Sequence, residues 1–221
     1  MSTADDRPSR ESNGVQLVHV DAHVVVAIKP SGQLSVPGRG PARQDCLYSA
    51  VREEFPDALV VHRLDMATSG LMLFARGAEA QRALNRAFAE RRIGKHYVAV
   101  VAGIVELEHG EIDLPLLADW PNRPLQKVDL TGGKPSRTRY RVLSRDRSAG
   151  SSRLELEPET GRAHQLRVHL FAIGHPILGD TLYAPPAARE AADRLLLHAA
   201  GLQFSHPQSG AALCLRAEAP F

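Results

Sequence analysis

Cysteine is scarce in this chain of 221 residues, since only Cys46 and Cys214 occur and they form no C-x-x-C pair. A disulfide framework is therefore not expected. We expect instead that both cysteines are thiols of a reduced protein. No apolar run approaches the roughly 20 residues that span a bilayer, and the first 14 residues lack the apolar segment of a secretory signal. We expect a cytoplasmic protein that does not enter a membrane.

An excess of charge of one sign is also missing, because 27 Lys and Arg residues stand against 25 Asp and Glu residues, a net charge of +2. Such a balance neither requires nor excludes a nucleic acid partner. Ten histidines occur, but without an H-E-x-x-H motif or a Cys/His cluster. His164 and His169 would point about 140° apart on a helix. We predict no metal and no organic cofactor.

The hydrophobic fraction of 43% is sufficient for a packed core. Helical spacing of apolar residues is found in DCLYSAVREEF, GAEAQRALNRAFAERR and HQLRVHLFAIG. Short strand patterns are found in VQLVHV, VVVAIK, LVVHRLD, LMLFAR, KHYVAVVAG, TRYRVLSR, SRLELEPE and AALCLRA. The absence of regular βαβ alternation predicts an α+β fold with a mixed, largely antiparallel sheet flanked by helices and loops. Residues 1–14 are expected to form a disordered tail, and residues 15–221 one domain.

A charged pair, Arg63 and Asp65, interrupts the apolar run LVVHRLD. If the run is an extended strand, both side chains lie on one face, and the guanidinium favours the ionised carboxylate. The pattern alone allows a surface turn capped by Asp65. It also allows a Ser-His-Asp site made of His62, Asp65 and Ser69, although these fall within eight residues and no G-x-S-x-G motif is present.

A basic run occupies residues 121–147. This segment contains eight basic residues and two acidic residues, Asp129 and Asp146, which gives a local net charge of +6. Such a concentration is typical of a surface that follows RNA phosphates, and Trp120 beside it could stack on a base. The alternative is a solvated strand edge. The basic residues are Arg123, Lys127, Lys134, Arg137, Arg139, Arg141, Arg145 and Arg147.

The segment HRLDMATSGLMLFA closely resembles the catalytic motif of the RluA family of pseudouridine synthases, which isomerise uridine in RNA. The resemblance runs from about Val15 to the C-terminus and implies a single pseudouridine synthase domain, with a catalytic cleft across the sheet and no S4-type RNA-binding domain. LADWPNRPLQKV and GKPSRTRY are similar to a dual-specificity subgroup that modifies 23S rRNA and the first anticodon-loop nucleotide of certain tRNAs. Other family segments follow in order: KPSG (29–32), KHYVAVVAG (95–103), GRAHQLRVH (161–169), HPILGD (175–180) and LLLHA (195–199).

The resemblance implies that Asp65 is the nucleophile, attacking either C6 of the base or C1′ of the ribose. It implies that Tyr97 stacks on the uracil and assists a proton transfer, and that Arg167 pairs with the aspartate. Arg63 would fill the space left by the flipped base. From the residues alone, Tyr97 could instead be a core tyrosine and Arg167 a solvent-facing helix residue.

The expected partners are 23S rRNA and the tRNA anticodon stem-loop, bound by a monomer. A catalytically silent RNA-binding protein and a glycosidase that does not rejoin the base are the alternatives. The expected RNA contacts are Arg63, Arg123, Lys127, Lys134, Arg137, Arg162, His164 and Gln165.

Overall fold

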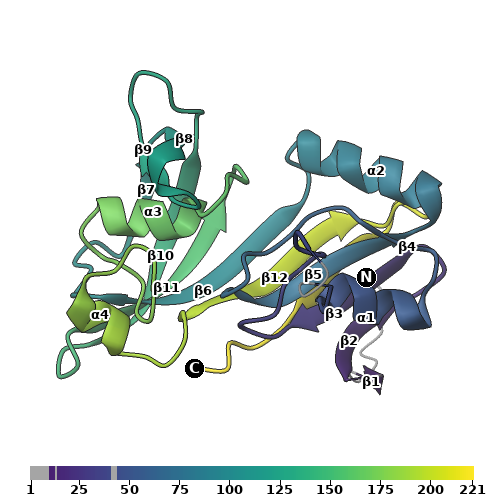
Figure 1. Cartoon of the computed structure of the whole chain (residues 1–221), viewed down its shortest axis with the longest axis horizontal. Coiled ribbons are helices and arrows are strands. Elements are labelled where there is room, and N and C mark those ends of the chain that lie inside the picture. Colours follow the sequence, from purple (N-terminus) through teal and green to yellow (C-terminus); the bar gives the residue numbers. More distant parts are fainter. Residues whose placement is uncertain (1–9, 13, 41–43) are drawn as a thin grey trace. The chain divides into compact units, whose positions relative to one another are not determined.

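The computed structural model describes residues 10–12, 14–40 and 44–221 (Figure 1). The chain forms two compact units, one of residues 1–95 and 199–220, the other of residues 96–198 with Phe221. Strands β6 (Gly94–Ala102) and β12 (Leu197–Ser205) each cross a boundary between these ranges. Both units combine antiparallel strand pairs with helices, which confirms the expected α+β fold.

In the first unit the strands follow the order β1-β2-β3-β5-β12, with β4 beside β5 and β13 beside β12. The pairings of β1 with β2, β2 with β3, β3 with β5, β4 with β5 and β12 with β13 are antiparallel. The elements are β1 (Arg10–Ser12), β2 (Val15–Val20), β3 (Val24–Lys29), α1 (Leu47–Glu54), β4 (Ala58–Val60), β5 (Ser69–Arg76), α2 (Gly77–Ala89) and β13 (Ala212–Arg216).

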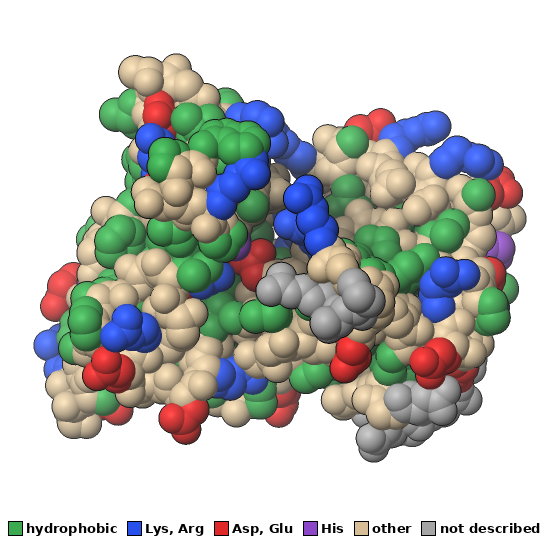
Figure 2. All heavy atoms as spheres, viewed as in Figure 1, with side chains coloured by type: hydrophobic (Ala, Val, Ile, Leu, Met, Phe, Trp, Pro, Cys, Tyr) green, Lys and Arg blue, Asp and Glu red, His purple; other side chains and the backbone are tan. Residues whose placement is uncertain are grey.

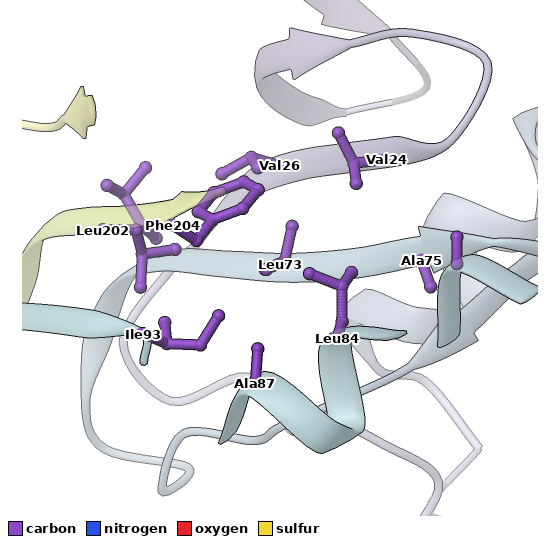
Figure 3. Packing of buried hydrophobic residues seen from close by; sticks show 11 residues of the cluster. Val24, Val26, Leu73, Ala75, Leu84, Ala87, Ile93, Leu202 and Phe204 are labelled. Atoms are coloured by element: carbon purple, nitrogen blue, oxygen red, sulfur yellow. The ribbon is translucent and has the colours of Figure 1, made fainter. Parts of the chain in front are cut away.

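The two faces of this sheet bury two separate cores, because successive strand residues point to opposite sides. Val24 and Val26 of β3 and Leu73 of β5 pack with Leu84 and other α2 residues on one face (Figure 3). The intervening residues of the same strands face the other core. These are Val25 and Ala27 of β3 and Met72 and Phe74 of β5, which pack with Leu47 and Val51 of α1. Strand β5 is thereby fixed from both sides, and with it the loop that precedes it.

In the second unit the strands follow the order β6-β11-β10-β7, and β8 and β9 form a separate antiparallel pair. The β10–β11 hairpin and the helix α3 appear where the sequence predicted them. No helix in the described ranges is long and apolar enough to span a membrane. The elements are β7 (His109–Asp113), β8 (Leu116–Ala118), a 3-10 turn (Trp120–Asn122), β9 (Gln126–Val128), β10 (Arg137–Asp146), β11 (Ser151–Pro158), α3 (Gln165–Ala172) and α4 (Pro186–Glu190).

Two expectations from the sequence were wrong in part. The strand expected over LVVHRLD ends at Val60, and residues 61–68 form a loop, so Arg63 and Asp65 do not lie on one strand face. The tail expected over residues 1–14 contains strand β1, since Arg10–Ser12 pairs with β2. The rest of that tail, residues 1–9 and 13, lies outside the described residues, while Gly14 forms a turn.

Candidate active site

The loop of residues 61–68, which carries Asp65, is held by a buried lysine. Lys29 is fully buried, and its ammonium donates to the carbonyl oxygens of Pro30 at 2.8 Å, Gln33 at 2.7 Å and Met66 at 2.9 Å. The backbone N–H of Gly32 donates to the same Met66 oxygen at 2.9 Å. Because hydrogen bonds to a buried charge are strong, this ammonium fixes the loop backbone against the turn that follows β3.

Two serines of the same turn complete the attachment. The Ser35 hydroxyl donates to the Leu64 carbonyl at 2.7 Å and accepts the Leu64 N–H at 3.0 Å. The Ser31 hydroxyl donates to the carbonyl of Ala67 at 2.7 Å. The KPSG segment and the HRLD segment, about 30 residues apart in the sequence, are therefore one structural unit in space.

His62 at the start of this loop is a neutral structural residue. Its Nε2 accepts the backbone N–H of Leu73 at 2.9 Å, and its ring lies 5.0 Å from that of Phe88. Burial, together with the charge of Lys95, lowers the pKa of His62 to about 4. The nitrogen that a catalytic base would use is occupied, and Ser69 is buried in β5. The Ser-His-Asp interpretation is therefore wrong.

The charged side chains lie at the tip of this fixed loop. Arg63 and Met66 are exposed and Asp65 is half-buried, while Leu64 between them is buried. The Thr68 N–H donates to the Asp65 carbonyl at 3.1 Å and closes a turn. The loop backbone is thus held in place, with Arg63 exposed and Asp65 half-buried, and a fixed backbone is what a reacting carboxylate requires.

Arg167 in the second unit is a buried, paired cation. Its side chain is 3% exposed, and its Nε and Nη2 donate to the two carboxylate oxygens of Asp180 at 2.8 and 2.5 Å. Asp180 is 1% exposed and also accepts the N–H groups of Leu182 and Tyr183. Arg167 is therefore not a solvent-facing helix residue. Its pairing with Asp65 stays a prediction.

Tyr183 joins the start of α3 to the β8–β9 hairpin. Its hydroxyl lies 2.6 Å from Nδ1 of His164 and accepts the Gln126 N–H of β9 at 2.9 Å. The guanidinium carbon of Arg167 lies 5.2 Å from its ring. Sequence reasoning missed both Tyr183 and Asp180. The HPILGD segment that ends at Asp180 was a family signal that could have drawn attention to the aspartate.

The side chain of Gln165 is hydrogen-bonded within the second unit. Its side chain is buried, and its oxygen accepts the Thr160 hydroxyl at 2.7 Å and the Arg162 N–H at 3.1 Å. Its amide nitrogen donates to the Arg137 carbonyl at 2.9 Å and the Thr138 hydroxyl at 3.0 Å. These bonds use both ends of the amide, so Gln165 supports the fold, and the RNA contact expected of it stays a prediction.

Two other residues from the sequence analysis keep their predicted roles untested. Tyr97 is half-buried in β6, opposite Leu156 of β11. The Arg162 side chain is exposed, and its Nε lies 3.4 Å from the carbonyl oxygen of Pro135. Both remain candidates, Tyr97 for stacking on uracil and Arg162 for contacting RNA.

The basic run along β10 is neutralised by the strands beside it. Arg137 pairs with Asp113 at 2.7 Å and also with Glu111 and Glu159. Strands β7, β10 and β11 together carry five arginines and five acidic residues, 5 − 5 = 0. The local excess of positive charge expected along β10 is therefore balanced by these carboxylates, and the RNA contact expected of Arg137 stays a prediction. The other ion pairs are Arg139 with Glu111 and Glu159, Arg141 with Glu155, and Arg145 with Glu108.

The basic residues that precede β10 differ. The Arg123 guanidinium carbon lies 3.3 Å from the ring centre of Trp120, which is 66% exposed. Within the described ranges, no carboxylate lies within 4 Å of the charged groups of Arg123, Lys127 or Lys134. These three therefore stay candidates for RNA contact, with Trp120 as an exposed stacking surface.

The buried histidine of α3 has structural partners. Nδ1 of His169 lies 2.9 Å from the Thr138 hydroxyl and Nε2 lies 3.0 Å from the Leu114 carbonyl oxygen. Burial lowers the pKa of His169. In the part of the chain that the structure describes, no group of three or more His, Cys, Asp or Glu residues is placed to hold a metal ion.

Several known proteins are similar to this chain in sequence and in fold. A family model described as RNA pseudouridylate synthase matches residues 23–172, which include Asp65, Tyr97 and Arg167. The dual-specificity RNA pseudouridine synthase RluA of Yersinia pestis is 51% identical over 205 residues, 93% of this chain and 99% of that protein. The protein of the same name from Escherichia coli strain K12 is 48% identical, over 93% of each. The solved structure of human RNA Pseudouridylate Synthase Domain Containing 1 has a TM-score of 0.79 at 28% identity, covering 97% of this chain and 87% of that one.

Proposed function

The chain belongs to the RNA pseudouridylate synthase family, and from this we propose that it isomerises uridine to pseudouridine in two RNAs, 23S rRNA and the tRNA anticodon stem-loop. Relatives that are 51% and 48% identical carry the name dual-specificity RNA pseudouridine synthase, which supports two substrates. The enzyme is then an isomerase. We assign its catalytic domain to residues 15–221, with β1 added to the sheet.

The reaction requires a nucleophile that adds to the nucleoside and later leaves. The N1–C1′ bond breaks, the uracil turns, and a C5–C1′ bond forms, while C5 loses its proton and N1 gains one, so no redox change occurs. An ionised carboxylate can fill this role. The observation that carries the proposal is the position of Asp65 at the tip of a loop whose backbone is held by Lys29, Ser31 and Ser35.

The remaining roles follow the family resemblance and the surroundings of each residue. We assign Arg167 to keep the carboxylate of Asp65 ionised, which suits a guanidinium held in one orientation by Asp180. Tyr97 is assigned to stack on the uracil. Arg63, exposed on the catalytic loop, is assigned to occupy the space of the flipped base.

Tritium release from RNA labelled at uridine C5 tests the proposal, because rejoining through C5 must expel that hydrogen. Separate transcripts of 23S rRNA fragments and of tRNA would be compared, with pseudouridine identified in each product. Tritium release from both RNAs supports a dual-specificity synthase. Release from one RNA alone would reduce the proposed substrate range to that RNA. Free uracil without pseudouridine would overturn the synthase in favour of a glycosidase.

A further inference from the structure

The outer face of α2 is rich in arginine. The helix buries Ala80, Leu84 and Ala87 against the sheet, and Arg82 and Arg86 lie on the opposite side, one turn apart. Both arginines are exposed. Basic side chains gather on the outer side of the region that α2 occupies (Figure 2). This face takes no part in the packing that fixes β5.

The charge of α2 together with the segment that follows it is not balanced along the chain. Residues 77–95 contain five basic and two acidic residues, 5 − 2 = +3, whereas the β7–β10–β11 strands sum to zero. Arg92 pairs with Glu90 at 2.6 Å. For Arg82, Arg86 and Arg91, no carboxylate within 4 Å is found in the described part of the chain. Solvated positive charge of this kind attracts polyanions.

Arg91 occupies a backbone position that favours glycine. The N–H of Arg91 donates to the Phe88 carbonyl at 3.1 Å and that of Arg92 to the Ala87 carbonyl at 2.8 Å, which is the Schellman ending of a helix. The φ angle of Arg91 is 57°, in the left-handed region where a side chain costs free energy. Arg91 is exposed at this position, where glycine would cost less free energy.

This end of α2 adjoins the catalytic loop. Phe88 contacts His62, the residue directly before Arg63. Burial and the charge of Arg91 together lower the pKa of Lys95, which shows that positive groups are close together here.

We propose that Arg82, Arg86 and Arg91 form an α2 ridge that contacts the phosphates of substrate RNA beside the catalytic loop. The inference rests on the function proposed above, because it takes RNA as the substrate. Guanidinium groups bind phosphate bidentately and independently of base sequence. The α2 ridge therefore contributes affinity and orientation, and base chemistry is left to the loop.

The test compares two double variants that lose the same charge. Arg82→Gln/Arg86→Gln removes two residues of the α2 ridge, and Arg139→Gln/Arg141→Gln removes two arginines paired within the sheet. The probe is an anticodon stem-loop transcript, with Kd measured over a series of KCl concentrations. We expect the α2 double variant to lower the slope of log K against log salt by about 1 to 2 and to raise Kd roughly tenfold to hundredfold at 0.1 M salt. The β10 double variant should keep a slope near that of the unmodified protein.

Arg91→Gly separates a binding role from a structural one. Glycine suits the left-handed position, so the thermal unfolding midpoint should stay unchanged or rise, while Kd for the stem-loop rises. In tritium-release assays Arg91→Gly and the Arg82→Gln/Arg86→Gln double variant should each have a higher KM. Their kcat at saturating RNA should be unchanged, because the reacting groups are not altered. Equal Kd and equal salt slopes for the two double variants would overturn the α2 ridge. That result is independent of whether the unmodified protein makes pseudouridine, which the tritium assay decides separately.

Discussion

Strand β10 and helix α2 are both rich in arginine, yet their charges serve different purposes. On β10 each of Arg137, Arg139 and Arg141 meets a carboxylate from a neighbouring strand. On α2, Arg82 and Arg86 meet none in the described residues and face solvent. Along the chain, the larger excess of positive charge lies in residues 121–147, with +6 against +3 for residues 77–95. When the neighbouring strands are included, β7, β10 and β11 sum to zero, whereas the excess on and after α2 remains. Electrostatic attraction of RNA depends on this second sum.

The largest effect should come from Asp65, the proposed nucleophile, because variants of the α2 arginines change binding only. Asp65→Asn keeps the size and polarity of the side chain but removes the nucleophilic carboxylate. We expect turnover to fall by at least about 10³-fold, in line with the loss of a catalytic nucleophile, and Kd for the stem-loop to change little. Single-turnover tritium release together with equilibrium binding measures both. Retained turnover would contradict the assignment of Asp65.

The next largest effect separates buried from exposed arginine pairs. Asp180→Asn removes the buried carboxylate that holds Arg167 by two hydrogen bonds, and it should lower the free energy of unfolding by about 3 kcal/mol or more. Glu155→Gln breaks the more exposed pair with Arg141 and should cost less than about 1 kcal/mol. Urea unfolding of both variants measures the difference.

Activity distinguishes a positioning role of Asp180 from a purely structural one. If the Asp180→Asn variant is folded, its kcat should fall by a larger factor than its KM changes. Asp180→Glu should recover part of kcat. Equal unfolding free energies for Asp180→Asn and Glu155→Gln would mean that burial does not set the strength of these pairs.

Local patterns in the sequence were sufficient for the elements whose partners are adjacent. The strands β2 and β3, the helix α2 and the β10–β11 hairpin each contain their own periodicity and turn residues. The loop of residues 61–68 could not be predicted in this way. Its conformation depends on Lys29 and Ser35, about 30 residues earlier, so an apolar run was interpreted as a longer strand.

Candidate site residues followed the same rule. Asp65 was proposed because it lies in a contiguous motif that resembles a known family. The pairing of Arg167 with Asp180 and the neutralisation of β10 were missed, since each requires groups from separate segments. The charge of a segment predicts the charge of the surface that it forms only where the segments packed beside it carry no opposite charge.

A smaller effect is expected for Arg63, which is an exposed arginine like those of α2 but is assigned to base flipping. Arg63→Ala should reduce turnover roughly tenfold on the folded stem-loop, because extruding a stacked base costs a few kcal/mol. On a short single-stranded RNA containing the same uridine the reduction should be slight. The ratio of the two rates is the measurement. An equal loss on both RNAs would assign Arg63 to phosphate binding, together with the α2 ridge.

The smallest effect should come from a paired carboxylate on the surface of the first unit. Partial burial alone would raise the pKa of Asp21, but hydrogen bonds from His19, His206 and the N–H groups of His23 and Val24 lower it to about 2. Since the folded pKa lies below the usual value of 3.8, the stabilisation is complete above pH 4 and is lost as the pH falls towards 2.

Asp21→Asn should therefore lower the free energy of unfolding at pH 6 and flatten its decline between pH 4 and pH 2. Urea unfolding at a series of pH values measures both quantities. An unchanged slope in Asp21→Asn would show that this carboxylate is as loosely paired as the exposed charges of β10, and that ion pairs at this surface contribute little at any pH.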